Sequence, residues 1–193
     1  MERRILIITG SHRKTGNTAL LAGWVADGAR DYGAQVDLVD AAHLKYKSNG
    51  CTSCYGCQDS AEYRCIIKDE ASDIIASMPE YDAVVFATPV YFFSLSAQIK
   101  LIMDRMYSLF KFKNNKFKNN LDKTNFAVIA SAAGDMGSGL EMTGAIIQKL
   151  AGFIGKKHKS LLIPNAPMDP VRTATDLEIK EKAMDFGAEL SQW

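Results

Sequence analysis

The amino-acid sequence predicts an α/β fold, a three-layer, doubly wound structure whose five parallel strands run in the order 2-1-3-4-5. Three observations lead to this prediction. Short apolar runs alternate with segments of helical periodicity along the whole chain. The runs are apolar on both sides, which is typical of strands that are covered on both faces. Successive parallel strands need right-handed crossovers, which place helices on both faces of the sheet.

The first strand and helix are clearly patterned. The run Ile5–Thr9 is apolar and β-branched, which predicts a buried strand. Gly16–Tyr32 is the first predicted helix, because an apolar stripe repeats at helical spacing. The residues of this stripe are Leu20, Leu21, Trp24 and Val25. We expect Asn17 or Thr18 to cap this helix, and Gln35–Val39 to form the second strand.

The middle of the chain repeats the alternation. Asp69–Met78 is predicted as a helix, with Ala71, Ile74, Ile75 and Met78 on one face. Tyr81–Thr88 is the clearest internal strand. Ala97–Leu109 is the next helix, and Ser94 or Ser96 is expected to cap it. Its inward-facing residues are Ile99, Ile102, Met103 and Met106.

The last third supplies two more strands and two more helices. The expected strands are Asn125–Ser131 and Ser160–Ile163, and the expected helices are Gly139–Phe153 and Thr175–Leu190. In the doubly wound order, ligands bind where the winding reverses, beyond the carboxyl ends of the first and third strands. We therefore look for a site in the loops that follow these two strands.

Composition limits the class of protein. Of 193 residues, 47% are hydrophobic and 23% are charged, which argues against general disorder. The 23 Lys and Arg nearly balance the 22 Asp and Glu, so a global nucleic-acid-binding signature is absent. No apolar run approaches the about 18–20 residues of a membrane-spanning helix, and the apolar start is too short for a signal-peptide core. We expect a cytoplasmic protein of one domain, residues 1–193, with no nucleic-acid or membrane partner.

Two long connections interrupt the regular pattern, and loops of this length are usually functional or disordered. One contains a cysteine-rich loop, residues 50–66, and the other is a Lys/Asn-rich insert, residues 110–123. The insert holds a perfect tandem repeat, in which Lys-Phe-Lys-Asn-Asn occurs at 111–115 and again at 116–120. The plain interpretation is a solvated, mobile loop. The functional alternative is a docking patch for an acidic redox protein such as ferredoxin, or for the 2′-phosphate of NADPH.

The loop after the first strand, 10–18, has the composition of a phosphate cradle. Glycine allows close backbone approach, short hydroxyl and amide side chains supply hydrogen bonds, and the following helix directs free N–H groups into the same concavity. The loop is neither G-x-x-x-x-G-K-[ST] nor G-x-G-x-x-G, so nucleoside-triphosphatase and ordinary dinucleotide fingerprints are absent. The alternative is a polar strand-to-helix turn with an N-cap.

The segment after the third strand forms the other wall of the predicted crevice. Pro89 fixes the turn, and the three aromatic residues of 91–93 suit a flat, partly apolar ring. The alternative is that these aromatic side chains fill the core beneath the next helix.

All four cysteines lie in one loop, with the spacing Cys51-x2-Cys54-x2-Cys57-x7-Cys65. The two x2 gaps let three thiolates converge on one small object, and Cys65 can return as a fourth ligand. Four thiolates are what a 4Fe–4S cluster requires. A zinc site, four unligated thiols and a disulfide pair are the alternatives, although a reducing compartment disfavours the last.

These motifs together resemble the flavodoxin-like NADPH-dependent FMN reductase family. The resemblance rests on residues 10–18 and 88–100, followed by Met103-Asp104-Arg105, and it extends to the order of elements along nearly the whole chain. The cysteine spacing is similar to the compact motif of the iron–sulfur flavoproteins, a branch of that family. In that branch, electrons accepted at a 4Fe–4S centre pass to FMN.

The resemblance implies a set of cofactor-binding residues. In the family, the first loop holds the FMN phosphate, the second lies along the ribityl chain and isoalloxazine, and the third follows the fourth strand. Carried over, this implies the phosphate ligands Ser11, Arg13, Thr15, Gly16, Asn17 and Thr18. It implies the flavin neighbours Pro89, Val90, Tyr91 and Phe92, and the third-loop residues Ala133, Gly134 and Asp135.

The favoured functional hypothesis is an FMN-dependent oxidoreductase that moves electrons from NAD(P)H through FMN to a small-molecule or protein acceptor. No catalytic side chain is assigned, because the flavin carries the reaction. The alternative is an electron carrier that relays electrons between ferredoxin and FMN through the four-cysteine cluster. A third hypothesis is a non-redox scaffold that binds FMN or another phospholigand and holds zinc. The resemblance implies a homodimer or homotetramer.

Overall fold

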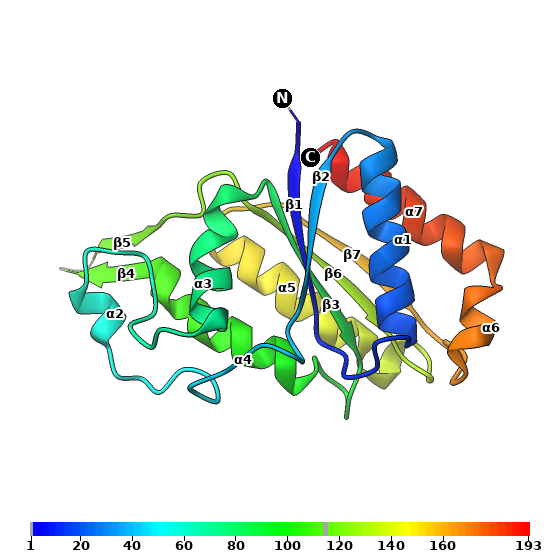
Figure 1. Cartoon of the computed structure of the whole chain (residues 1–193), viewed down its shortest axis with the longest axis horizontal. Helices are drawn as coiled ribbons and strands as arrows, with labels where there is room; N and C mark the ends of the chain where they lie inside the picture. Colours follow the sequence, from blue (N-terminus) through cyan, green and yellow to red (C-terminus); the bar gives the residue numbers. More distant parts are fainter. Residues whose placement is uncertain (1, 114–115) are drawn as a thin grey trace.

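The computed structural model describes residues 2–113 and 116–193, and its central feature is a five-stranded parallel sheet (Figure 1). The strand order is β2-β1-β3-β6-β7, which confirms the predicted doubly wound order. Every neighbouring pair in this sheet is parallel. The strands are β1 (Arg4–Thr9), β2 (Gln35–Asp40), β3 (Ala83–Pro89), β6 (Asn125–Ser131) and β7 (His158–Ile163).

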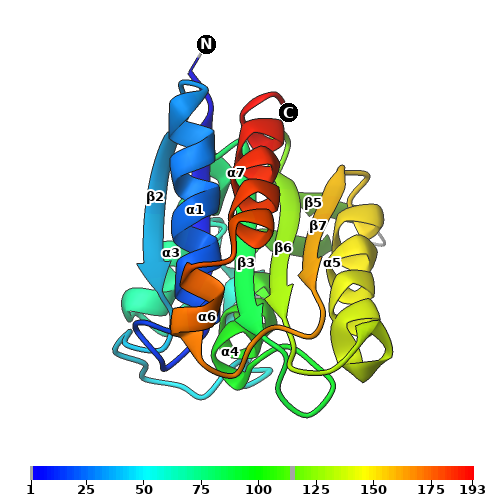
Figure 2. The same cartoon turned by 90° about the vertical axis from the view of Figure 1, so that its right-hand side faces the viewer.

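Helices cover both faces of the sheet, so the three-layer prediction is confirmed (Figures 1 and 2). One face carries α1 (Asn17–Asp31) and α7 (Leu177–Ser191), which lie side by side, with the short α6 (Pro170–Ala174) at their lower end in Figure 2. The opposite face carries α3 (Glu70–Ser77), α4 (Ala97–Arg105) and α5 (Glu141–Phe153). No helix among the described residues has the length and apolar character that crossing a membrane requires.

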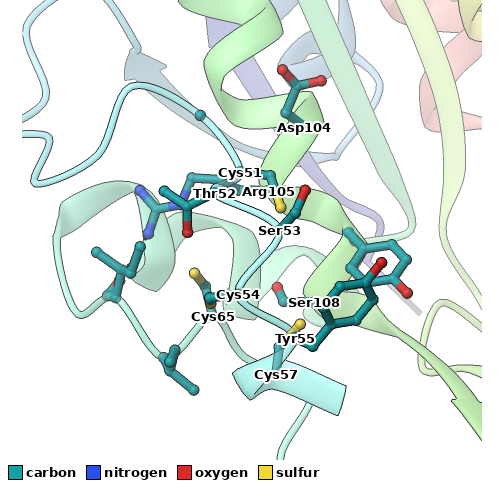
Figure 3. Close-up of a pocket in the computed structure, with 14 residues that line it drawn as sticks. Cys51, Thr52, Ser53, Cys54, Tyr55, Cys57, Cys65, Asp104, Arg105 and Ser108 are labelled. Atoms are coloured by element: carbon teal, nitrogen blue, oxygen red, sulfur yellow. Dashed lines mark hydrogen bonds between the residues drawn. The ribbon is translucent and has the colours of Figure 1, made fainter.

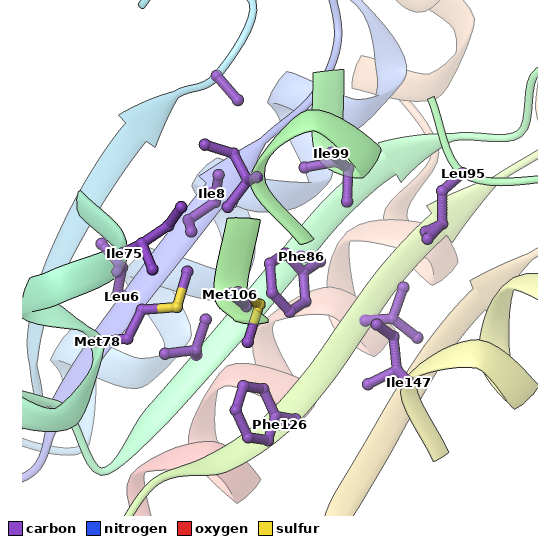
Figure 4. Close-up of a cluster of buried hydrophobic side chains, with 14 of the residues drawn as sticks. Leu6, Ile8, Ile75, Met78, Phe86, Leu95, Ile99, Met106, Phe126 and Ile147 are labelled. Carbon is purple, nitrogen blue, oxygen red and sulfur yellow. The ribbon is translucent and has the colours of Figure 1, made fainter. Parts of the chain in front are cut away.

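The two faces of the sheet bury separate hydrophobic cores. Along β1, Ile5 and Ile7 join the core beneath α1 and α7, whereas Leu6 and Ile8 join the core beneath α3, α4 and α5. Figure 4 shows the second core, where the rings of Phe86 and Phe126 stack with centroids 6.4 Å apart. Period-two alternation between two buried faces explains why the strands are continuous apolar runs rather than alternating ones.

Several helix ends differ from the predictions. The α1 cap is Gly16, and the expected caps Asn17 and Thr18 are wrong, because both residues already lie within the helix. Ser96 caps α4 as predicted, and its hydroxyl accepts from Ile99 N. The predicted helix 97–109 ends early, since residues 106–109 form the 3₁₀ turn η2 (Met106–Leu109). The 3₁₀ turn η1 (Met78–Glu80) similarly follows α3.

Glycine and proline explain two further differences in the last third of the chain. The predicted helix start at Gly139 is wrong, because this residue has a left-handed φ of 104° inside the turn η3 (Met136–Leu140). The helix α5 therefore begins at Glu141. The helix α6, which was not predicted from the sequence, begins at Pro170 and is capped by Asp169.

The insert is not the expected loop but an antiparallel hairpin of β4 (Phe110–Lys113) and β5 (Lys116–Asn119). The two copies of the repeat pair with each other, with Phe112 opposite Phe117. Asn114 and Asn115, in the middle of the repeat, lie outside the described residues. Alternation of Lys and Phe gives the hairpin an aromatic side, where Phe117 packs 5.1 Å from the ring of Phe153 on α5.

Candidate functional sites

A cavity of about 190 Å³ opens at the carboxyl edge of the sheet, at the predicted switch point, and we call it the carboxyl-edge cavity. The segments that follow β1, β3, β6 and β7 all contribute to its walls. It brings together most of the predicted cofactor residues. Those that line it are Ser11, Arg13, Gly16, Asn17, Thr18, Pro89, Val90, Tyr91 and Ala133.

The amino end of α1 gives this cavity an anion-binding wall. Among the described residues, the first-turn amides of Asn17, Thr18 and Ala19 have no hydrogen-bond partner, and no side chain caps the helix. By contrast, α3, α4, α6 and α7 are each capped by an Asp or Ser side chain. Free N–H groups and the positive end of the helix dipole favour a phosphate, and the exposed Arg13 adds a cation. The residues present fit the phosphate of FMN.

Four predicted cofactor residues lie outside the lining of the cavity: Thr15, Phe92, Gly134 and Asp135. Thr15 is exposed on the loop, and the Gly134 carbonyl accepts from Asn165 N at 2.8 Å. The carboxylate of Asp135 caps the following turn, since it accepts hydrogen bonds from the amide and the hydroxyl of Ser138 at 3.0 and 2.8 Å.

The aromatic segment after β3 forms a tight turn rather than filling the core. Tyr91 and Ser94 exchange backbone hydrogen bonds, and the two central residues have left-handed φ values of 47° at Phe92 and 70° at Phe93. The side chain of Phe92 is 94% exposed. The core-filling alternative is therefore wrong for this segment, and Tyr91 is the aromatic residue that reaches the carboxyl-edge cavity.

The segment after β7, which was not predicted from the sequence, forms a fourth wall. Ala166, Pro167, Met168 and Pro170 line the cavity, and the Asn17 side chain donates to the Pro167 carbonyl at 2.7 Å. The other polar atom of Asn17, Oδ1, is buried and has no partner among the described residues. An unpaired acceptor here fits a ligand hydroxyl such as those of a ribityl chain. The available signal was positional, because β7 ends at the same edge as β1 and β3.

The four cysteines surround a second cavity of about 420 Å³, which we call the cysteine cavity (Figure 3). Cys51, Cys54, Cys57 and Cys65 all line it, although they span 15 positions of the sequence. Cys57 is buried, Cys65 is half-buried, and the other two are exposed. The two cavities share no lining residue.

Left-handed turns wrap the chain around the cysteine cavity. Ser53 and Tyr55 have φ values of 54° and 57°, and Gly50 has φ 98°. Such conformations are costly for non-glycine residues and reverse the chain direction over short spans. Hydrogen bonds from the Gly56 backbone amide and the Thr52 side chain lower the pKa of the Cys54 thiol. This favours the thiolate, which is the form that binds metals.

The donor set of the cysteine cavity consists of four thiols. Within residues 2–113 and 116–193, no three His, Cys, Asp or Glu side chains are placed to hold a single metal ion. Both a zinc ion and a 4Fe–4S cluster take four thiolate ligands. Four cysteines that line one cavity offer the donor type that an iron–sulfur group takes.

The β4–β5 hairpin holds the cysteine loop. The buried Lys111 ammonium donates to the backbone carbonyls of Cys57, Ser60 and Glu62. The Gln58 side chain, next to Cys57, pairs with the β4 backbone through two hydrogen bonds of 2.8 and 3.0 Å. The lysine-rich insert therefore fixes the cysteine loop through one buried lysine and through the two hydrogen bonds between Gln58 and β4.

A buried ion pair lies beside the cysteine cavity. Arg105 lines the cavity and pairs with Asp69 at 2.8 Å, and both side chains are fully buried. Burial lowers the pKa of Arg105, but its contacts with Asp69 and with the Cys65 thiol outweigh burial and raise it. Burial likewise raises the pKa of Asp69, but the hydrogen bond from Arg105 and two backbone amides bring it below its usual range. Both partners are therefore charged at neutral pH.

Comparison with known proteins identifies the family that this chain matches. The sequence profile of the NADPH-dependent FMN reductase family matches residues 3–165. An iron–sulfur flavoprotein of Methanocaldococcus jannaschii is 33% identical over 102 residues, which is 53% of this chain and 51% of the relative. An iron–sulfur flavoprotein of Archaeoglobus fulgidus is 26% identical over 173 residues, 89% of this chain and 77% of the relative. The matches to the first two curated relatives span only 51% and 43% of their lengths.

Solved structures support the fold. An NAD(P)H:quinone oxidoreductase from Methanothermobacter marburgensis superimposes with a TM-score of 0.74, covering 100% of this chain and 98% of the other. The sequences are only 12% identical, so this similarity concerns the flavodoxin-like architecture alone.

Proposed function

This chain belongs to the NADPH-dependent FMN reductase family, and from that premise we propose that it is an FMN-dependent oxidoreductase with a second redox centre at its cysteines. FMN occupies the carboxyl-edge cavity and a 4Fe–4S cluster occupies the cysteine cavity. The observation that carries this proposal is that all four cysteines line one cavity, and that this cavity is separate from the one at the uncapped end of α1. Relatives named iron–sulfur flavoproteins support it.

The residues of the carboxyl-edge cavity bind and orient FMN. The free amides at the start of α1 and the cation of Arg13 hold the phosphate. Asn17 anchors the α1 end to the segment after β7 and offers its free Oδ1 to the ribityl chain. The small side chains of Ala132 and Ala133 leave room for backbone groups to approach the ring edge. When bound, FMN accepts electrons in pairs and releases them in pairs or singly.

The residues of the cysteine cavity supply the ligands of the cluster. Cys51, Cys54, Cys57 and Cys65 each offer one thiolate, and Gly50 and the left-handed residues Ser53 and Tyr55 give the loop its curvature. A 4Fe–4S cluster transfers one electron at a time. The chain would then connect a one-electron protein partner, such as ferredoxin, with the two-electron chemistry of FMN.

The first test is the measurement of iron, acid-labile sulfide and FMN on protein purified without oxygen. We expect about four irons and four sulfides per chain together with one FMN. Cys51→Ala should lose most of the iron and sulfide and keep its FMN, because Cys51 lines only the cysteine cavity. One FMN with no iron, unchanged in the variant, would remove the cluster from the proposal and leave a flavoprotein with free thiols.

A second candidate function keeps the flavin and takes its electrons from NAD(P)H. The description of the family supports a nicotinamide donor. Steady-state reduction of a quinone or azo dye by NADH and by NADPH, at matched FMN content, tests it. Turnover that persists in Cys51→Ala would assign the activity to the flavin alone.

We also propose that the protein is a cytoplasmic homodimer or homotetramer. The molar mass of the protein in solution tests the oligomeric state.

A further inference from the structure

Arg105 is the largest fully buried side chain in the described part of the chain, and it is 1% exposed. It ends α4 and lines the cysteine cavity. A buried cation is costly unless it is paired and hydrogen-bonded. The contacts of this guanidinium therefore determine how its charge is stabilised.

Arg105 and Asp69 together fasten both ends of the cysteine loop. Arg105 donates to Asp69 Oδ2 and to the Ile67 carbonyl, both at 2.8 Å. Asp69 also accepts from the Lys47 amide at 2.9 Å, so the chain before the cysteines and the chain after them meet at one ion pair. Ser72, whose amide donates to Asp69, donates through its hydroxyl to the Cys65 carbonyl at 3.2 Å.

One nitrogen atom of Arg105, Nε, is buried and has no hydrogen-bond partner among the described residues. An unpaired buried donor costs about 1–3 kcal/mol, and all four cysteines line the same cavity as Arg105. An anionic sulfur group in that cavity would provide the acceptor. Arg4 and Arg64 also have an unpaired Nε, but neither is fully buried and neither lines the cavity.

We propose that Arg105 is a positioning residue of the cysteine centre that donates from Nε to a sulfur atom of the bound cluster and raises its reduction potential. The inference rests on the proposed iron–sulfur function. Reduction adds one electron from the external donor to the cluster and makes it more negative. A fixed cation and a hydrogen bond to sulfur stabilise this reduced state more than the oxidised one.

The test compares cluster potentials in Arg105→Met, Arg105→Lys and a matched control, Arg64→Met. Arg64 is a more exposed arginine of the same loop, is paired with Asp73, and does not line the cavity. The readouts are iron content, thermal stability and the midpoint potential from an anaerobic titration followed by electron paramagnetic resonance. None of these depends on turnover.

We expect Arg105→Met to lower the ratio of reduced to oxidised cluster, at a fixed applied potential, by about tenfold, which is 59 mV for a one-electron couple. Arg105→Lys keeps the charge but lacks Nε, so its potential should lie between those of the wild type and Arg105→Met. Arg64→Met should match the wild type, because the partly exposed charge of Arg64 is paired with Asp73 and screened by solvent.

The outcomes separate the inference from the function on which it rests. A wild-type chain without iron removes both. A wild-type chain with its cluster, and an iron-replete Arg105→Met of unchanged potential, overturns the inference and leaves the function standing. If Arg105→Met does not fold, Arg105→Lys decides. A lowered potential in its residual cluster supports the proposal, and a wild-type potential reduces Arg105 to a purely structural role.

Discussion

Replacement of Lys111 by Met tests whether the hairpin holds the cysteine loop. Lys111 belongs to a tandem repeat that looks like a solvated charge run, but its side chain is only 9% exposed. Its ammonium donates to the carbonyls of Cys57, Ser60 and Glu62, the last two at 2.8 and 2.6 Å. Methionine retains the length and apolar stem of lysine and removes all three donors.

The magnitude of this effect follows from the three contacts. Hydrogen bonds from a charged group contribute about 1.5–3 kcal/mol each, but desolvation of the ammonium opposes them by several kcal/mol. Ser60 and Glu62 are partly or fully exposed, so water replaces the lost donor there. Cys57 is buried, and leaving its carbonyl unpaired costs about 1–3 kcal/mol. We therefore expect Lys111→Met to lower the free energy of unfolding by about 3 kcal/mol.

The assay compares Lys111→Met with Lys116→Met, the same position in the second copy of the repeat, where the lysine is exposed. For a chain of this size 1 kcal/mol shifts Tm by about 2–4 °C, so Lys111→Met should melt about 6–12 °C lower. Lys116→Met should change Tm by less than about 2 °C, because exposed substitutions stay within about 0.5 kcal/mol. Alkylation of the buried Cys57 should accelerate only in Lys111→Met.

Equal losses in both variants would refute this reasoning, because they would trace the effect to net charge rather than to the three carbonyls. Unchanged stability in both variants, with unchanged alkylation of Cys57, would refute it as well. In that case the hairpin would lie against the cysteine loop without holding it.

Three further predictions concern the frame and the carboxyl-edge cavity. Gly187→Ala should lower the free energy of unfolding by about 1–3 kcal/mol in thermal melts, because a Cβ at this position would collide with the α1 backbone. In the control Gly23→Ala, the new Cβ meets open space, so the free energy of unfolding should stay the same or rise by up to about 1 kcal/mol. Burial raises the pKa of Tyr81 from 10.0 to about 12, so between these values the unfolded chain releases a proton that the folded chain keeps. Stability should therefore fall as pH rises through that window, and Tyr81→Phe should flatten the urea-unfolding profile there. Asn17→Ala should weaken FMN binding about fivefold in a fluorescence titration, because loss of the hydrogen bond to the Pro167 carbonyl removes about 1 kcal/mol of binding free energy. An unchanged affinity for FMN would exclude Asn17 from the site.

The sheet was predictable because its strands are buried on both faces. The predicted strand Asn125–Ser131 matches β6 at both ends, and the strand order follows from helical crossovers of one hand. Helix ends were less predictable, because they depend on tertiary partners. Asn17 looks like a cap in sequence, but its amide is already engaged by Pro167, more than a hundred residues later.

The residues of the carboxyl-edge cavity were predictable in the loops that directly follow β1, β3 and β6. They were not predictable in the segment after β7, which reaches the cavity only through the tertiary fold. The loops after β1 and β3 and Ala133 after β6 were identified from residue type and position, and they line the cavity. The wall after β7 carries no binding motif, since Ala166 and Met168 contribute shape rather than polar groups. The turn at Phe92 shows the opposite failure, because this aromatic residue follows β3 but has a left-handed φ, is 94% exposed and does not line the cavity.

The repeat shows why composition alone could not assign the insert. Lys111 and Lys116 occupy the same position in two identical pentapeptides, so no local property separates them. The hairpin places β4 against the cysteine loop, where Lys111 donates to carbonyls of a short helix, α2 (Gly56–Asp59), and of the turn after it. The hairpin leaves Lys116 of β5 exposed to solvent. One lysine thereby becomes a buried tie and its copy remains a surface charge. As a docking patch for an acidic redox protein, the exposed copy makes a further prediction. Lys116→Met should weaken the encounter with that protein at low salt and leave Tm unchanged. Lys111→Met should lower Tm and leave the encounter unchanged.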